Sequence, residues 1–135
     1  MPRGEDPWDL ALLLVNAGLE DARAGLASGR ALLAQALRVW RDVEGVAGIA
    51  LALAGLGELA AVDGDGRRAG QLIGASQALL PASDALLAVI TPFDLPSCIA
   101  RARARVDPSA FDRGLAEGAA WSLDQAVAEG LAQVE

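Results

Sequence analysis

Residues 45–80, GVAGIALALAGLGELAAVDGDGRRAGQLIGASQALL, constrain the fold of this chain more than any other stretch. They read as two apolar-faced helices joined by the tight turn Asp63-Gly64-Asp65-Gly66. Within it, Asp65 is suited to cap the second helix, and Gly57 in the first helix indicates that a neighbouring helix approaches closely. The apolar positions recur at helical spacing: Ile49, Leu53, Leu56 and Ala60, then Ala69, Leu72, Ile73, Ser76 and Leu79. The stretch therefore predicts an antiparallel helical hairpin.

The composition extends this prediction to the whole chain. Hydrophobic residues make up 53% of the sequence but aromatic residues only 4%, so the core must consist of Leu, Ala, Val and Ile. Small side chains let helices pack closely, whereas a sheet would favour more β-branched and aromatic residues. With 135 residues the chain is long enough for one continuous core. We expect one all-α domain, residues 1–135.

The charged and reactive side chains exclude several functions. The formal charge of -7 argues against direct binding of nucleic acid, which depends on clustered cations. Every basic residue is an arginine, and the chain contains no lysine, histidine or tyrosine. It therefore lacks the imidazole base, the Schiff-base amine and the phenol on which most catalysis relies. We expect a protein that is not an enzyme and that needs no cofactor.

Two isolated features resemble chemical sites but have simpler explanations. Cys98 is the single cysteine, so it forms no intramolecular disulfide, and without a histidine to activate it we expect a small buried hydrophobe. The turn at residues 63–66 resembles the start of a calcium loop, but Arg67 and Arg68 follow where further oxygen ligands are required. A turn and a helix cap account for all four residues, and we expect no metal site.

No segment of the sequence has the pattern of a targeting or membrane-spanning element. The N-terminus MPRGEDPW lacks a basic region followed by an apolar signal core. The longest apolar run, residues 48–57, is too short to cross a bilayer. The expectation is a soluble cytoplasmic protein without membrane contact.

Cap signals divide the rest of the chain into further helices. Asp6-Pro7 and Asp107-Pro108 each place an aspartate before a proline at the first helical position, and Ser122 with Gln125 fits a capping box. Residues 85–89 favour a helical extension inside a proline-containing connector. The expected helices are about seven: residues 7–18, 28–41, 46–62, 66–80, 97–106, 108–120 and 123–131.

Helical spacing also predicts which face of each remaining helix points inward. The inward residues by this criterion are Leu10, Leu13, Leu14 and Ala17; Leu32, Leu33, Ala36, Leu37 and Trp40; Phe111, Leu115 and Ala119; and Leu123, Val127 and Leu131. Two helical hairpins, residues 6–80, are thus followed by a connector, residues 81–96, and by capping helices, residues 97–132.

The two hairpins repeat with a period near 40 residues. Leu13 corresponds to Leu53, Leu33 to Ile73, and Ala36 to Ser76. In the second hairpin, small and large residues follow the spacing of a tetratricopeptide repeat, which it resembles, although the usual aromatic positions hold Leu, Ala or Ile. The fold class expected is a short tetratricopeptide-like array of stacked antiparallel hairpins, an αα-superhelix.

A longer resemblance covers residues 39–131. The hairpin residues Gly64-Asp65, Arg68-Ala69, Leu72 and Gly74-Ala75 are followed by Phe111, Gly118, Ser122-Leu123 and Ala126. This combination resembles the C-terminal tetratricopeptide-like segment of large bacterial signal-transduction ATPases, including LuxR-type regulators. The resemblance implies a terminal repeat array and its cap. The chain has neither the phosphate-binding GKS or GKT loop of the family nor its DNA-reading helix-turn-helix.

Two kinds of side chain are candidates for contacts with a partner. Trp8, Trp40 and Trp121 can anchor a protein or peptide, including a second copy in a homodimer, if they are exposed; the alternative is that they belong to the core or the cap. Arg101 and Arg105 share a helix face. Either this face is exposed to solvent, or one of the two arginines binds an acidic group of a small effector. The sequence thus favours a non-catalytic interaction or scaffolding module of a bacterial regulator, with a small-ligand sensor as the alternative.

Overall fold

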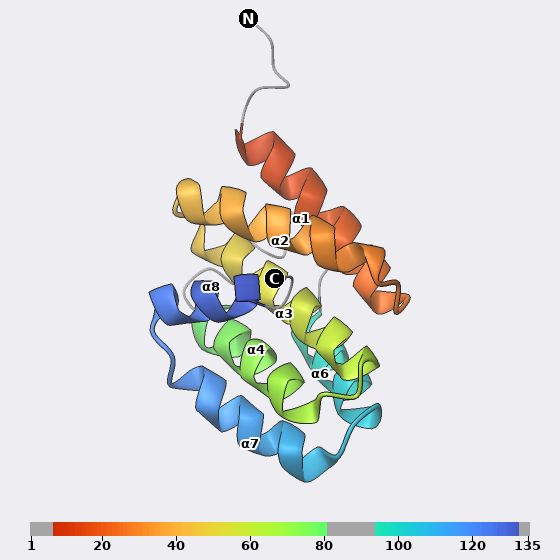
Figure 1. Ribbon diagram of the computed structural model, residues 1–135. Coiled ribbons are helices and arrows are strands. Elements are labelled where there is room, and N and C mark those ends of the chain that lie inside the picture. Colours follow the sequence, from red (N-terminus) through yellow and green to blue (C-terminus); the bar gives the residue numbers. More distant parts are fainter. Residues whose placement is uncertain (1–6, 81–93, 133–135) are drawn as a thin grey trace, which may run out of the picture.

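The computed structural model describes residues 7–80 and 94–132, and within these ranges the chain consists of helices and turns. This confirms the expected all-α fold class. Seven helices are described (Figure 1): α1 Pro7–Arg23, α2 Ser28–Asp42, α3 Val46–Val62, α4 Gly66–Leu79, α6 Leu95–Ala104, α7 Pro108–Ala119 and α8 Leu123–Ala132. None of them is long and apolar enough to cross a membrane.

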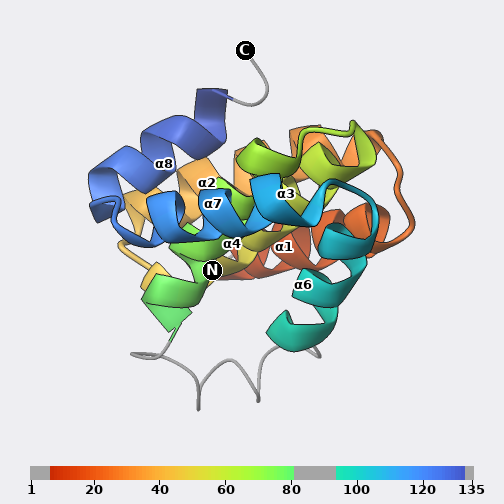
Figure 2. The same ribbon diagram turned by 90° about the horizontal axis from the view of Figure 1, so that it is seen from below.

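The helices stack in neighbouring pairs around α3 (Figures 1 and 2). α1 pairs with α2 and α3 with α4, while α2 and α1 both pack against α3. α6 and α8 also contact α3, and α7 lies along α4. As a result every residue from Ala47 to Ala61 is buried. α3 is therefore the central helix, as expected for an apolar segment without a polar face.

Three turns end their helices with the same backbone arrangement. In each turn one residue has a positive φ and donates its N–H to the carbonyl three residues earlier, and the next residue donates to the carbonyl five residues before it. This is the Schellman pattern of helix C-termini. The positive-φ residues are Gly25 (φ 75°), Glu44 (φ 57°) and Gly64 (φ 85°). Glycine occupies this position without strain, whereas the side chain of Glu44 makes it unfavourable.

The two hairpins are structural repeats with a spacing of 39 to 40 residues. Leu33 lies over Gly18 in the first hairpin, and Ile73 lies over Gly57 in the second, so Leu33 and Ile73 are equivalent. α3 begins and ends 39 residues after α1. Leu13 therefore corresponds in the structure to Ala52 and not to Leu53.

The cap signals place the helix starts correctly. Asp65 accepts a hydrogen bond from the backbone N–H of Arg68 at 3.1 Å, and Asp107 accepts one from Ala110 at 3.0 Å. Ser122 accepts from the N–H of Gln125 at 3.1 Å. Each of these side chains satisfies an N–H group that has no partner within its helix.

Some predicted boundaries are wrong. α6 begins at Leu95 and ends at Ala104 instead of covering residues 97–106, and Pro96 lies inside its first turn, where a missing N–H costs no hydrogen bond. α1 continues to Arg23, five residues beyond the predicted end. The predicted extension over residues 85–89 and the cap residue Asp6 lie outside the described residues.

Three of the predicted inward faces are wrong in part, although the predicted Phe111 on α7 and Val127 on α8 are buried. On α1 the predicted Leu10 and Leu13 are 46% and 68% exposed. On α7 the predicted Ala119 is exposed, and on α8 the predicted Leu123 is 38% exposed. The buried faces are Ala11, Val15, Gly18, Leu19 and Ala22 on α1, Phe111, Gly114 and Gly118 on α7, and Ala126, Val127 and Gly130 on α8. Glycines take the place of large side chains because the helices approach too closely to fit them.

α4 and α7 run parallel and approach each other very closely. The four glycines at this contact face backbone atoms of the other helix: Gly70, Gly74, Gly114 and Gly118. A Cβ added to Gly118 would lie 1.8 Å from the carbonyl oxygen of Gln71, and one added to Gly70 would lie 2.1 Å from that of Phe111. The backbones of the two helices are therefore in direct contact. We call this contact the glycine seam.

Substitution of Gly118 by alanine should disrupt the glycine seam. Alanine favours helix formation in isolation, but its Cβ collides with a backbone oxygen that cannot move without separating the helices. We expect urea unfolding to give a free energy of unfolding lower by about 3 kcal/mol. Gly66→Ala is the control, because its Cβ would meet only side chains of Val106 and Ala110 at 3.1 Å or more. Equal stability of the Gly118→Ala variant and the wild type would contradict the seam.

Replacement of Glu44 by glycine should stabilise the protein. The positive φ of this residue is unfavourable for any side chain, and glycine removes the strain at the cost of some entropy in the unfolded state. We expect a free energy of unfolding higher by up to about 1 kcal/mol, measured by urea unfolding. Glu44→Gln retains the strain and should be close to the wild type. A destabilised Glu44→Gly variant would argue against this account.

Candidate functional site

The three tryptophans lie in different environments. Trp40 is 1% exposed, and its ring packs against the backbone of Gly45 and Gly48. Trp8 is 46% exposed and meets Trp40 edge to face, with ring centroids 4.8 Å apart. Trp121 is partly buried and packs against the main core. The ring of Trp8 is thus the most exposed of the three, and it packs against the buried ring of Trp40.

The two candidate arginines do not act together. Arg101 donates from Nε and Nη2 to the two carboxylate oxygens of Glu58, at 2.7 and 3.2 Å. Arg105 follows the last residue of α6 and is exposed. The guanidinium of Arg101 therefore holds α6 on α3. Of the two arginines, Arg105 is the one that is exposed to solvent, as one of the two predicted alternatives required.

The pair of Glu58 and Arg101 lies beside the single cysteine. Glu58 is 2% exposed, and Cys98 is fully buried, with its Sγ donating to the carbonyl of Ala54 at 3.8 Å. Burial raises the pKa of the Cys98 thiol far above its usual range, and the negative charge of Glu58 raises that pKa further. The thiol therefore stays protonated, and it is not a nucleophile at neutral pH.

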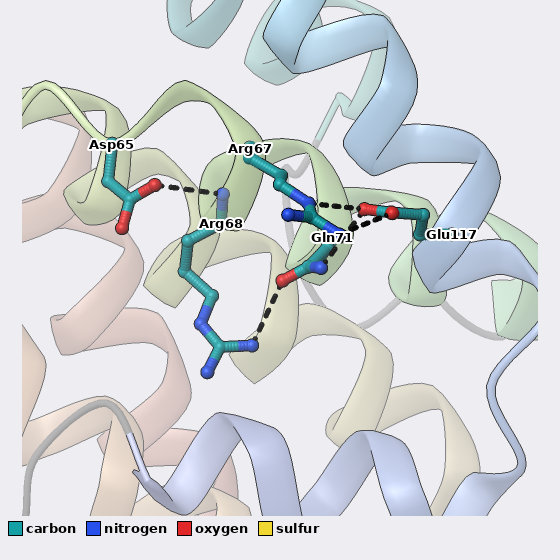
Figure 3. Close-up of polar contacts among 5 residues, drawn as sticks. All are labelled: Asp65, Arg67, Arg68, Gln71 and Glu117. Carbon is teal, nitrogen blue, oxygen red and sulfur yellow. Dashed lines mark hydrogen bonds and ion pairs between the residues drawn. The ribbon is translucent and has the colours of Figure 1, made fainter.

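A second polar network joins α4 to α7 and α8, and Figure 3 shows the part of it between α4 and α7. Arg67 donates to both carboxylate oxygens of Glu117 at 2.8 and 2.7 Å, and the side-chain amide of Gln71 donates to the same carboxylate at 3.1 Å. Arg68 donates to Gln71 at 3.1 Å and forms an ion pair with Glu129 at 2.7 Å. The network orients α7 and α8 relative to α4.

The charge of this network depends on pH. The hydrogen bond from Arg67 holds the pKa of Glu117 below its usual range. A carboxylate with a lowered pKa in the folded state stabilises that state at neutral pH, and the contribution is lost as the pH falls through the lowered pKa. Because these side chains are exposed to solvent, the contribution is small.

The largest exposed apolar side chains near one another in sequence lie on the outer face of α1. Leu10 is 46% and Leu13 is 68% exposed. Their equivalents in the second hairpin, 39 residues later, are Ile49 and Ala52, which are 2% and 0% exposed. The same helix face is thus buried in the second repeat and open in the first. We call Leu10 and Leu13 the α1 face and regard it as the candidate site; Trp8 lies on the opposite side of α1, against Trp40.

Two hollows lie on the surface of the described residues, and neither of them is lined by Arg101 or Arg105, the two arginines of the predicted effector site. One, of about 500 Å³, lies open at the α6–α7 turn and is lined by Ala100, Arg103, Ala104, Val106 and Pro108. The guanidinium of Arg103 is held by Asp112 at 3.1 and 2.9 Å. The other lies between the α2–α3 turn and α8. The connector that the predicted effector site included lies largely outside the described residues.

Comparison with protein-family models, with curated proteins and with solved structures found no match to this chain. Within residues 7–80 and 94–132, no three His, Cys, Asp or Glu side chains are grouped so that they can hold a metal ion. The site must therefore be interpreted from its own geometry.

Sequence reasoning recognised Leu10 and Leu13 as one apolar helix face but placed it inside the protein. The sequence contains a signal against this interpretation, because Ala11, Val15 and Leu19 form a second apolar face on the same helix. A helix with two apolar faces needs neighbours on both sides. The sequence also carries a signal at Glu44, which follows the end of a helix at a position where the other two Schellman turns have glycine.

Removal of Arg101 should leave the carboxylate of Glu58 buried without a partner. We expect Arg101→Leu to lower the free energy of unfolding by about 3 kcal/mol, because an isolated buried charge is costly. The double variant Glu58→Leu with Arg101→Leu should recover most of this loss, since no charge remains. Urea unfolding of the two single variants and the double variant measures the coupling. Additive losses would show that the pair makes no coupled contribution.

Proposed function

We propose that this chain is a non-catalytic protein-interaction module that docks another helix on the α1 face. The sequence resemblance to the C-terminal helical-repeat segment of bacterial signal-transduction regulators supports a scaffolding role in such a protein, in the cytoplasm. The observation that carries the proposal is the contrast between the exposed Leu10 and Leu13 and their buried equivalents Ile49 and Ala52.

The way in which helical repeats stack supports this proposal. Each repeat buries its apolar surface only by stacking on a neighbour, so a repeat that lacks a neighbour exposes that surface. In the second hairpin the equivalent residues Ile49 and Ala52 are buried, α2 and α8 both contact α3, and Ile49 lies beside Leu123 and Val127 of α8. The α1 face has the same apolar character, and a helix that covers it extends the array.

The occupant that we propose is a second copy of the chain. A twofold axis at α1 brings Leu13 of one copy against the same face of the other, so one apolar surface serves both partners. Burial of a leucine contributes about 1.5–3 kcal/mol, which supports weak, concentration-dependent association. Each copy carries a net charge of -7, so the copies repel each other and added salt should strengthen the dimer.

Substitution of Leu13 by glutamate should abolish this association. Leu13 is 68% exposed, so its replacement leaves the folded chain intact but introduces a charge at the centre of the contact. Light scattering coupled to size-exclusion chromatography should give a dimer mass for the wild type at high concentration and a monomer mass for the Leu13→Glu variant. Circular dichroism should give the same helix content for both.

Leu26→Glu is the matched control for this experiment. Leu26 is 51% exposed in the α1–α2 turn, away from the α1 face, and its replacement adds the same charge. We expect this variant to dimerise like the wild type. A wild-type chain that stays monomeric at high protein and high salt concentration contradicts docking of a second copy, and equal loss in both variants contradicts the α1 face as the contact.

A further inference from the structure

A hollow of about 250 Å³ opens between the α2–α3 turn and α8. Its apolar lining consists of Val46 and Ile49 from the start of α3 and of Leu123 and Val127 from α8. Ile49 and Val127 are buried, whereas Leu123 is 38% exposed at its wall. We call this hollow the α8 groove. Its position depends on α8, which Arg68 of α4 ties down through Glu129.

The rim of the α8 groove is acidic. Glu44 and Asp124 line it and are exposed. The one basic residue at the rim, Arg41, is paired with its neighbour Asp42 at 3.3 Å, so its charge is offset locally. An apolar pocket with a negative rim is complementary to an apolar side chain that has cationic neighbours.

Glu44 has a backbone conformation that its side chain disfavours. The equivalent positions of the two other turns, with the same pair of hydrogen bonds, are Gly25 and Gly64. The dipoles of α2 and α3 oppose each other at Glu44, so they give no net reason for an anion there. Asp124, in contrast, is explained locally by its place in the first turn of α8. A strained residue at the edge of a pocket indicates a function that outweighs the strain.

The size of the groove limits what can occupy it. At about 250 Å³ it is smaller than the roughly 300–1,000 Å³ of typical small-molecule sites. It can accept one apolar side chain from a protein, with the remaining contacts formed at the rim. This favours a peptide segment over a free metabolite.

We propose that the α8 groove binds a basic segment of a partner protein, in which one leucine-sized side chain enters between Ile49, Leu123 and Val127 and a flanking arginine or lysine contacts Glu44. The inference goes beyond the proposed function, because the groove and the α1 face are formed by different residues. Asp124 provides a second acidic contact for the segment.

The test is a titration of the isotope-labelled full chain, followed by NMR, with two capped pentapeptides. One has the pattern Ala-Arg-Leu-Arg-Ala, and its matched control has Ala-Glu-Leu-Glu-Ala. We expect the basic peptide to shift the signals of Ile49, Leu123 and Val127 and to bind more weakly as salt is added. Absence of such shifts up to about 10 mM peptide, or equal binding of the acidic peptide, overturns the proposal.

Two variants of Glu44 separate binding from folding. Glu44→Gln removes the charge but keeps the strain, and we expect it to weaken binding of the basic peptide about two- to fivefold. Glu44→Gly should weaken binding by the same factor although it makes the fold more stable. Unchanged affinity in both variants overturns the role of Glu44. A chain that dimerises through α1 but does not bind the basic peptide refutes only this inference.

Discussion

The direct backbone contact between α4 and α7 is the constraint on which the C-terminal half of the structure depends. Four glycines allow the two parallel helices to approach so closely that a single added methyl group would collide with a carbonyl oxygen. Close approach of this kind maximises dispersion contacts and admits no alternative register. Because α7 is fixed on α4, α6 before it and α8 after it are confined to positions over α3.

Charged side chains refine this arrangement at its edges. Arg67 and Arg68 bind acidic residues on α7 and α8, and Arg101 holds α6 through the buried Glu58. The exposed pairs add little stability, whereas the buried pair is costly to break and therefore favours one position of α6. The glycine seam and these ion pairs together determine where the capping helices lie, and hence where the α8 groove opens.

At both candidate binding surfaces, residues depart from the usual preferences for burial of apolar side chains or for backbone conformation. The α1 face exposes leucines whose equivalents one repeat later are buried. The α8 groove has an exposed leucine on its wall and a glutamate in a conformation that suits glycine. Sequences usually agree with their fold at every level, and departures concentrate where a partner completes the structure. Both departures lie on surfaces around the first helices of the two hairpins.

The sequence by itself determined the class of fold and most helix starts, because these depend on nearby residues. Asp65, Asp107 and Ser122 cap the helices that they were expected to cap, and the apolar run of residues 46–62 forms the buried central helix. The repeat was also visible, with Leu33 and Ile73 as equivalent positions. Such signals act over one or two helical turns.

Only the tertiary structure decided which apolar face each outer helix buries and which charges pair. α1 has two apolar faces, and packing on α2 and α3 selected the one with Ala11 and Val15, so that Leu13 faces outward. Arg101 finds Glu58, which lies 43 residues away in sequence, instead of acting with Arg105. On α7, glycines and not Ala119 face inward, because the distance between the helices is set by contact with α4. Local spacing describes one helix at a time, whereas these choices depend on the shape of the neighbouring helix.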